Sequence, residues 1–261
     1  MSSVAVDLSH EREPLPVARV LRAYLMEAKL ETLAALRTPG FAIPFVAVPV
    51  AAYLLFGVVI AANAGPGIAN YLFAGFAVLA VSMPGIFSCA ILATEREGNV
   101  LKLKRALPLP PGAAIVAKVL MSMIVAAIAV TFVAVAALVA AKLTLTLAQV
   151  AIIWLVLIAG TIPFCAIGLL IGTLSSASAA PAWGNLLFLP MMWLSGLFIP
   201  LPKSLERWVI LWPSFHLDQL ALGLAGVEQF TFIPPAIAAA VLTGVTVLCG
   251  GLAIRRLARV G

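Results

Sequence analysis

The residues that could carry out chemistry are few in this sequence and lie far apart. His216 and Asp218 are two positions apart in a polar, aromatic segment, where they could form a general acid–base pair. A polar cluster at the start of a helix would explain the same two residues, and we favour that interpretation. No H-E-x-x-H or G-x-x-x-x-G-K-[ST] motif occurs, so the sequence predicts neither a metal site nor a nucleotide site, and no cofactor is expected on this chain.

The densest group of charges is the stretch 95–112, which reads E-R-E-G-N-V-L-K-L-K-R-A-L-P-L-P-P-G. It lies between two of the most apolar runs of the chain. Six of its residues are charged; at about 2.5–3.5 kcal/mol each, they would cost roughly 15–20 kcal/mol at mid-bilayer. The stretch is therefore expected in water. A charged loop without catalytic residues is typical of a surface that another protein binds.

The composition indicates whether the helices or strands that hold these residues lie in water or in a membrane. Of 261 residues, 64% are apolar and only 10% are charged, and the mean hydropathy is +1.16. Apolar runs longer than 18 residues predict membrane-spanning helices rather than barrel strands. The net charge of +6 does not indicate nucleic acid, because the cations flank the apolar runs and form no single face. We therefore predict an all-α integral membrane protein.

Six spans and several connecting segments are expected. The predicted spans cover 41–62, 70–94, 113–141, 148–174, 181–199 and 230–254, and together they form a transmembrane domain over 38–254. A polar tail (1–13) precedes an amphipathic interfacial helix (14–37), in which apolar residues recur at helical spacing. A solvated helix on a cytosolic partner is the alternative for 14–37. Segment 200–229 is aromatic and too irregular to span, which favours external re-entrant helices carrying Trp208, Trp212, His216 and Asp218.

The distribution of cations predicts the orientation. Six spans place both termini on one side, and with that side in the cytoplasm thirteen lysines and arginines are inside and three are outside. Loop 95–112 and tail 255–261 are then cytoplasmic, and 200–229 is external. Lys118 is expected to reach the headgroups from the end of its span. No other charge lies within the spans, which disfavours ion-coupled transport and indicates that any energy comes from elsewhere.

Two motifs resemble a known family, the membrane subunits of type-2 ATP-binding-cassette (ABC) exporters. Stretch 95–112 looks like the family segment E-R-E-x-G-T-L-x-x-L-x-x-T-P-L between spans two and three. Downstream, L-S-G-L-F-I-P at 194–200, followed by L-P-x-x-L-x-x-W and W-P-x-x-H, resembles the fifth span and the external helices. The likeness covers about 15–255. Asn99 and Leu222 depart from it, since the family commonly has Gly or Thr at the first position and Arg near the second.

The resemblance implies the partners and the working parts. Two copies of the chain, or the chain and a relative, would form the pathway in a bacterial inner membrane above two cytosolic ATPase subunits, which would hold ATP and Mg. Contacts with the ATPase would come from the coupling helix and the interfacial helix, at Glu97, Gly98, Leu101, Lys102, Leu103, Lys104, Arg105, Arg22 and Lys29. Spans two and five would line the pathway with Phe73, Phe76, Phe87, Trp183, Phe188 and Trp193.

The expected function is export of an amphiphilic, drug-like or lipid-linked substrate. Two alternatives stay open from the sequence. One is a membrane enzyme that acts on lipid at the external face through His216 and Asp218. The other is a stand-alone carrier, or a scaffold that transports nothing. A topological role alone is a further alternative for any single cation of the loop.

Overall fold

The computed structural model describes residues 17–61, 66–106, 110, 112–140, 143–198, 208–227 and 230–260. Every regular element in these ranges is a helix. The N-terminal tail (1–13) and most of the first half of the predicted re-entrant segment lie outside the described residues.

Five helical segments within the described residues are long and apolar enough to cross a membrane. They are Pro39–Ile60, Gly67–Glu97, Ala113–Ala140, Leu147–Leu174 and Pro235–Arg259. These correspond to five of the six predicted spans, and they confirm a multi-pass helical protein. The segment predicted as span five contains α9 (Ala180–Trp193), which has 14 residues. A bilayer needs about 20 residues, so span five, and with it the total of six, stays a prediction.

Several spans consist of two helical pieces. The first joins α2 (Pro39–Tyr53) to η1 (Leu54–Ile60), a π-helical stretch. The second joins α3 (Pro66–Ala90) to α4 (Leu92–Glu97), and the fourth joins α7 (Leu147–Ala159) to α8 (Thr161–Leu174). The third and the last are the single helices α6 (Ala113–Ala140) and α12 (Pro235–Val260).

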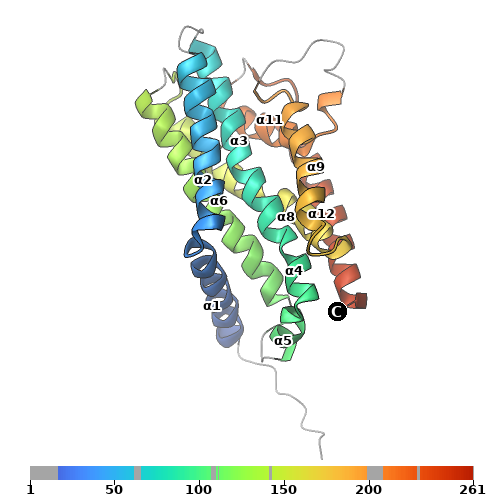
Figure 1. Ribbon diagram of the computed structural model, residues 1–261. Helices are drawn as coiled ribbons and strands as arrows, with labels where there is room; N and C mark the ends of the chain where they lie inside the picture. The colour runs from blue at the N-terminus through green and yellow to red at the C-terminus, as the bar shows by residue number, and fades with distance from the viewer. Residues whose placement is uncertain are drawn as a thin grey trace, which may run out of the picture.

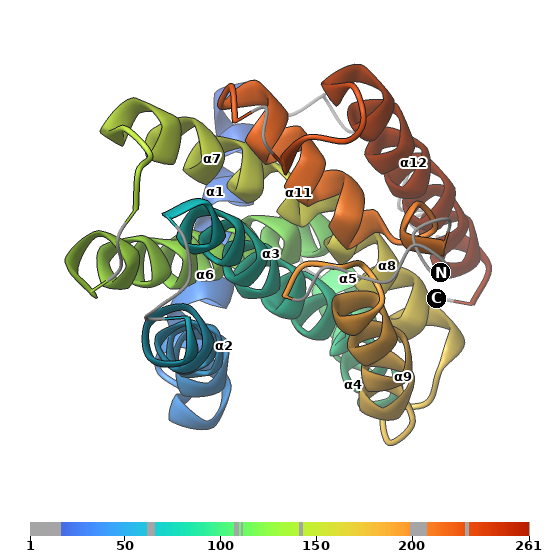
Figure 2. The same cartoon turned by 90° about the horizontal axis from the view of Figure 1, so that it is seen from above.

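Helix α3 is the centre of the bundle. It packs against α2, α6, α8 and α9, which surround it in the view from above (Figure 2). Glycine brings α3 and α8 together: a Cβ atom on Gly168 would overlap the carbonyl oxygen of Ile86, and one on Gly85 would lie 2.7 Å from Cβ of Phe164. Small residues at such contacts let the two backbones approach closely.

Different helices lie at the two ends of the bundle. At the lower end of Figure 1 lie α1 (Val17–Leu36), α4, the short helix α5 (Val100–Ala106) and the end of α12. At the upper end lies α11 (Pro213–Leu224). Helix α1 packs on α6 through the small residues Ala28, Thr32 and Ala35, while its large apolar side chains, among them Leu21 and Leu25, are exposed. An exposed apolar face is what an interfacial helix requires.

Candidate functional site

Five charged residues from four helices meet at the lower end of the bundle. We call them the ion-pair cluster: Glu27 and Glu31 of α1, Glu95 of α4, Lys104 of α5 and Lys118 of α6. Nζ of Lys104 lies 2.9 Å from Oε1 of Glu27 and also pairs with Glu31. Nζ of Lys118 lies 2.6 Å from Oε1 of Glu95 and 3.6 Å from Oε2 of Glu31. Glu31 therefore joins the two lysines, and the cluster connects all four helices.

The ion-pair cluster is largely buried, unlike a surface salt bridge. The sequence predicted that Lys118 reaches the headgroups, but Lys118 is only 1% exposed. The reason is that α1 crosses α6 at this point and supplies the carboxylate of Glu31 as a partner. Burial opposes the ionisation of Glu31, but Lys118 and Lys104 favour it, and the net effect lowers the pKa of Glu31. Burial likewise opposes the charge on Lys104, but Glu31 and Glu27 outweigh it and raise the pKa of Lys104.

The positions of these charges follow from local sequence. Glu27 and Glu31 are four residues apart, so both project from the same face of α1. Ala28, Thr32 and Ala35 form the buried face next to them, and Ala113, Ala117 and Met121 are among the buried residues of α6. Small side chains on both helices allow the close approach that brings Glu31 to Lys118.

A tight turn aims α5 at the ion-pair cluster. Helix α4 ends at Gly98, and Asn99 follows with φ 57°, the left-handed region. Among residues with a Cβ atom, asparagine tolerates this region best, and glycine tolerates it freely. Asn99, which departs from the family pattern in sequence, is therefore suited to the backbone conformation of this turn. The turn then leads into α5, where Lys104 points back to α1.

Two arginines bind the C-terminal end of α8. Both terminal nitrogens of Arg96 donate hydrogen bonds, Nη1 to the carbonyl oxygen of Thr173 and Nη2 to that of Ser175 at 2.6 Å. Nε of Arg256, near the end of α12, donates to Thr173 at 3.2 Å. The last carbonyls of a helix have no partner within the helix and carry partial negative charge, so a cation here satisfies both needs. Arg96 thus fixes α4 to α8.

The residues predicted to contact another protein divide into an outer and an inner group. Leu103 is 67% exposed, although it is a large apolar side chain next to water-facing charges. Leu101 is half-buried and packs against the small hydrophobic cluster around Leu92 and Leu257. Lys104 is held within the ion-pair cluster. The exposed predicted contacts are Arg22, Lys29, Glu97, Gly98, Lys102 and Leu103; the side chain of Arg105 lies outside the described part.

The six aromatic residues predicted to line a pathway do not form one surface in the single chain. Phe73, Phe76 and Phe188 are buried, with at most 6% exposure, and Phe87 is half-buried. Rings of Phe87 and Phe188 pack 5.5 Å apart, centre to centre. Only Trp183 and Trp193, both on α9, are more than half exposed. Their role as lining residues stays a prediction.

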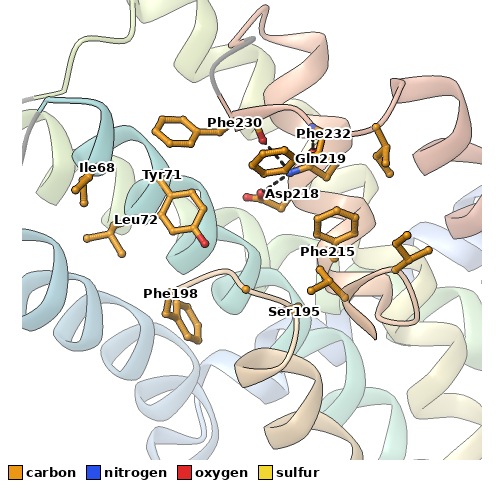
Figure 3. A pocket seen from close by; sticks show the side chains of 14 residues that line it. Ile68, Tyr71, Leu72, Ser195, Phe198, Phe215, Asp218, Gln219, Phe230 and Phe232 are labelled. Carbon is orange, nitrogen blue, oxygen red and sulfur yellow. Dashed lines mark hydrogen bonds between the residues drawn. The ribbon is translucent and has the colours of Figure 1, made fainter. Parts of the chain in front are cut away.

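A cavity of about 590 Å³ lies at the upper end, between α3, α11 and the segments around 195–198 and 230–233. Figure 3 shows Tyr71 of α3 and Asp218 of α11 directed into it, among the rings of Phe198, Phe215, Phe230 and Phe232. Gln219 holds its wall: Nε2 donates to the carbonyl oxygen of Phe230 at 3.0 Å, and Oε1 accepts from the backbone N–H of Phe232 at 2.6 Å.

His216 and Asp218 have separate surroundings. Nε2 of His216 lies 2.8 Å from the carbonyl oxygen of Ile210. Asp218 faces the cavity and is 3% exposed. Positions two apart on a helix project about 200° from each other, so α11 directs the two side chains to different places. This geometry does not support an acid–base pair. Of the two tryptophans predicted here, Trp208 is exposed and Trp212 is half-buried.

Several residues of the lower and upper sites were not among the sequence predictions. Glu27 and Glu31 were missed, although two acids one turn apart in a basic helix indicate a partner of opposite charge. Tyr71 and Gln219 were also missed. No local signal marks them, because their importance comes from contacts with segments far away in the sequence.

The family model described as ABC-2 type transporter matches residues 24–216. The ion-pair cluster lies within this range, whereas the upper cavity is also lined by residues beyond it, Asp218, Gln219 and residues of 230–233. A search of curated proteins found no match.

Proposed function

Because the chain belongs to the ABC-2 type transporter family, we propose that it is the membrane subunit of an ATP-driven exporter that works as a homodimer above two separate ATPase subunits. Family membership itself makes the chain a transmembrane component of an ABC transporter, a multi-pass protein that works with an ABC ATPase and has no catalytic site of its own. Direction of transport, copy number and substrate belong to the proposal.

The ion-pair cluster is the observation that carries the proposal. An ATPase subunit that binds the exposed side of α5 would move Lys104, and with it Glu27 and Glu31 of α1. Lys118 would pass the displacement to α4 and α6 through Glu95. Helix α4 follows the central helix α3 after a single residue, so motion at the lower end reaches the middle of the bundle. ATP and Mg would be bound by the partner.

The proposed membrane is the bacterial inner membrane, with the lower end and both termini in the cytoplasm. The distribution of cations supports this orientation. External thiol reagents should label a cysteine placed at Leu143 and should fail to label one at Lys102 or Arg256. External labelling at Lys102 would contradict the orientation and the ATPase contact together. A cysteine at Lys203, which lies outside the described residues, should also be labelled from outside.

The substrate is proposed to be amphiphilic, drug-like or lipid-linked. Aromatic and aliphatic side chains dominate both α3 and α9, and such surfaces bind apolar bodies without fixing one chemical structure. The separate surroundings of His216 and Asp218 do not favour the alternative of a lipid-modifying enzyme.

Substitution of Leu103 tests the ATPase contact. Leu103→Asp should abolish co-purification of the ATPase and ATP-dependent export, because an exposed leucine at the centre of a contact typically contributes about 2 kcal/mol or more. The melting temperature of the chain alone should not change. Leu101→Asp is the matched variant: it places a charge against the cluster around Leu92 and should lower the melting temperature. Lys102→Ala should have little effect on either quantity.

If a Leu103→Asp chain still recruits the ATPase and exports normally, α5 is not the ATPase contact. In that case the ion-pair cluster would be a structural support of the lower end, and the ATPase would have to bind elsewhere.

A further inference from the structure

The carboxylate of Asp218 is buried, and within the described part of the chain one of its two oxygen atoms lacks a hydrogen-bond donor. It is 3% exposed, and its Oδ1 atom has no hydrogen-bond partner among the described residues. Its Oδ2 atom has one distant donor, Nε2 of Gln219 at 3.4 Å, and that nitrogen already donates to Phe230 at 3.0 Å. A buried carboxylate without compensation is costly. An unpaired oxygen directed into a cavity therefore indicates a missing donor.

The walls of the cavity are suited to a cation. Five of the described lining residues carry aromatic rings, namely Tyr71, Phe198, Phe215, Phe230 and Phe232 (Figure 3). The faces of such rings attract cations, and more strongly where water is excluded. Among the described residues that line the cavity there is no lysine or arginine. The volume of about 590 Å³ is in the range of sites for small organic ligands.

We propose that this upper cavity is a binding site for an amphiphilic amine, whose ammonium group donates a hydrogen bond to Oδ1 of Asp218 while its apolar body packs against the surrounding aromatic rings. The cavity lies at the upper end of the bundle, away from the proposed ATPase contact at the lower end. Whether the bound amine is exported rests on the proposed function, but the binding itself does not.

The ionisation of Asp218 should control this binding. Burial raises the pKa of Asp218 to about 7, and the hydrogen bond from Gln219 acts in the opposite direction. Among the described lining residues, Tyr71 is the other titratable group. His216, on α11 with Asp218, contacts the carbonyl oxygen of Ile210 instead. An ammonium ion requires the carboxylate form. Binding should therefore weaken as the pH falls through 7, while an alkylamine with a pKa of about 10 stays protonated.

A pair of probes that differ only in charge tests the proposal. Dansylcadaverine carries a primary amine, and its N-acetyl derivative has the same fluorescent body without the charge. Each is titrated, by fluorescence, into the full chain in lipid nanodiscs, with empty nanodiscs subtracted. We expect the amine to bind at least tenfold more tightly than the acetylated probe at pH 8. Asp218→Asn, which is nearly isosteric, should abolish that preference.

A matched pair of ring substitutions tests the aromatic walls. Phe232 is 70% exposed and borders the cavity, whereas Phe132 is 55% exposed on α6 and does not. Phe232→Leu should weaken binding of the amine several-fold, and Phe132→Leu should leave it unchanged. Equal effects of the two would point to partition into the membrane and would overturn the proposal.

The pH dependence of binding is measured on the parent chain alone, so this test remains valid even if Asp218→Asn folds poorly. Affinity for the amine should fall about tenfold or more from pH 8 to pH 5.5 as the carboxylate is protonated, and affinity for the acetylated probe should stay constant. A parent chain that shows no preference for the amine, or an Asp218→Asn variant that keeps it, would refute the site. All arms omit the ATPase and ATP, so their failure would leave the export proposal untouched, and failure of export would leave these results standing.

Discussion

Replacement of Lys118 by methionine should destabilise the protein strongly. The side chain of Lys118 is only 2% exposed, and those of its partners Glu31 and Glu95 are 16% exposed. Methionine has a similar volume and makes no ion pair, so packing changes little. Glu95 would lose its ion-pair partner at 2.6 Å, and Glu31 would keep only Lys104.

The magnitude follows from the burial of this pair. Loss of one member of a buried ion pair typically costs about 3–5 kcal/mol, because the remaining charge is left uncompensated. We take the lower end, about 3 kcal/mol, since the acids keep some contact with water. For a chain of this size, 1 kcal/mol corresponds to roughly 2–4 °C, so the melting temperature should fall by roughly 6–12 °C.

The assay is thermal unfolding of the chain in detergent, followed by intrinsic tryptophan fluorescence. Lys102→Met is the control, since it removes an exposed lysine from α5 and should shift the melting temperature by no more than about 2 °C. The double variant Lys118→Met with Glu95→Gln removes both charges of the closest pair. It should recover at least half of the loss, because residues in one ion-pair network are not additive.

Either of two results would refute the reasoning. A Lys118→Met chain that melts within 2 °C of the parent would mean that Lys118 makes no net contribution. Strict additivity in the double variant would mean that Glu95 and Lys118 do not interact in the folded protein.

Three further predictions concern backbone contacts and pH. Gly168→Ala should lower stability by about 1–3 kcal/mol, because its Cβ atom would overlap the carbonyl oxygen of Ile86, while Gly251→Ala, with open space around it, should be neutral in the same melting assay. Asn99→Gly should preserve stability and Asn99→Val should cost about 1–2 kcal/mol, as judged by melting, since φ 57° disfavours a β-branched residue. The pKa of Glu31 is lower in the folded protein than its unfolded value of 4.5, so ionised Glu31 stabilises the fold above pH 4.5, and this stabilisation is lost as the pH falls through the lower folded value. The melting temperature should therefore drop less between pH 7 and pH 3 in Glu31→Gln than in the parent. An equal drop in the two proteins would contradict this role of Glu31.

Periodicity and length were enough to predict the helices. The apolar runs led to six predicted spans, and the structure bears out five of them to within about five residues, since a spanning helix needs a minimum number of apolar residues whatever its neighbours are. The resemblance to type-2 ABC exporters is confirmed by the family match. The resemblance rested on short motifs in the loop at 95–112 and at 194–200, not on the long apolar spans.

Contacts between distant segments could not be predicted. Lys104 and Glu31 are separated by 73 positions, and only the crossing of α1 over α6 brings them together. The same crossing buried Lys118, which a sequence argument based on its distance from the end of a span had placed at the headgroups. The upper cavity likewise depends on Tyr71 and Asp218, whose proximity no local pattern indicates.

The central position of α3 has a consequence for how the chain is made. Its main partner α8 begins at Thr161, 71 residues after α3 ends at Ala90 (161 minus 90). At synthesis rates of about 5–20 residues per second, roughly 4–14 s pass before α8 leaves the ribosome. During that interval the face of α3 around Gly85, Ile86 and Cys89, which later contacts α8, has lipid or the insertion machinery as its neighbour. The most buried helix of the finished protein is thus, for some seconds, one of its most exposed, and variants of Gly168 should prolong that exposure during biogenesis.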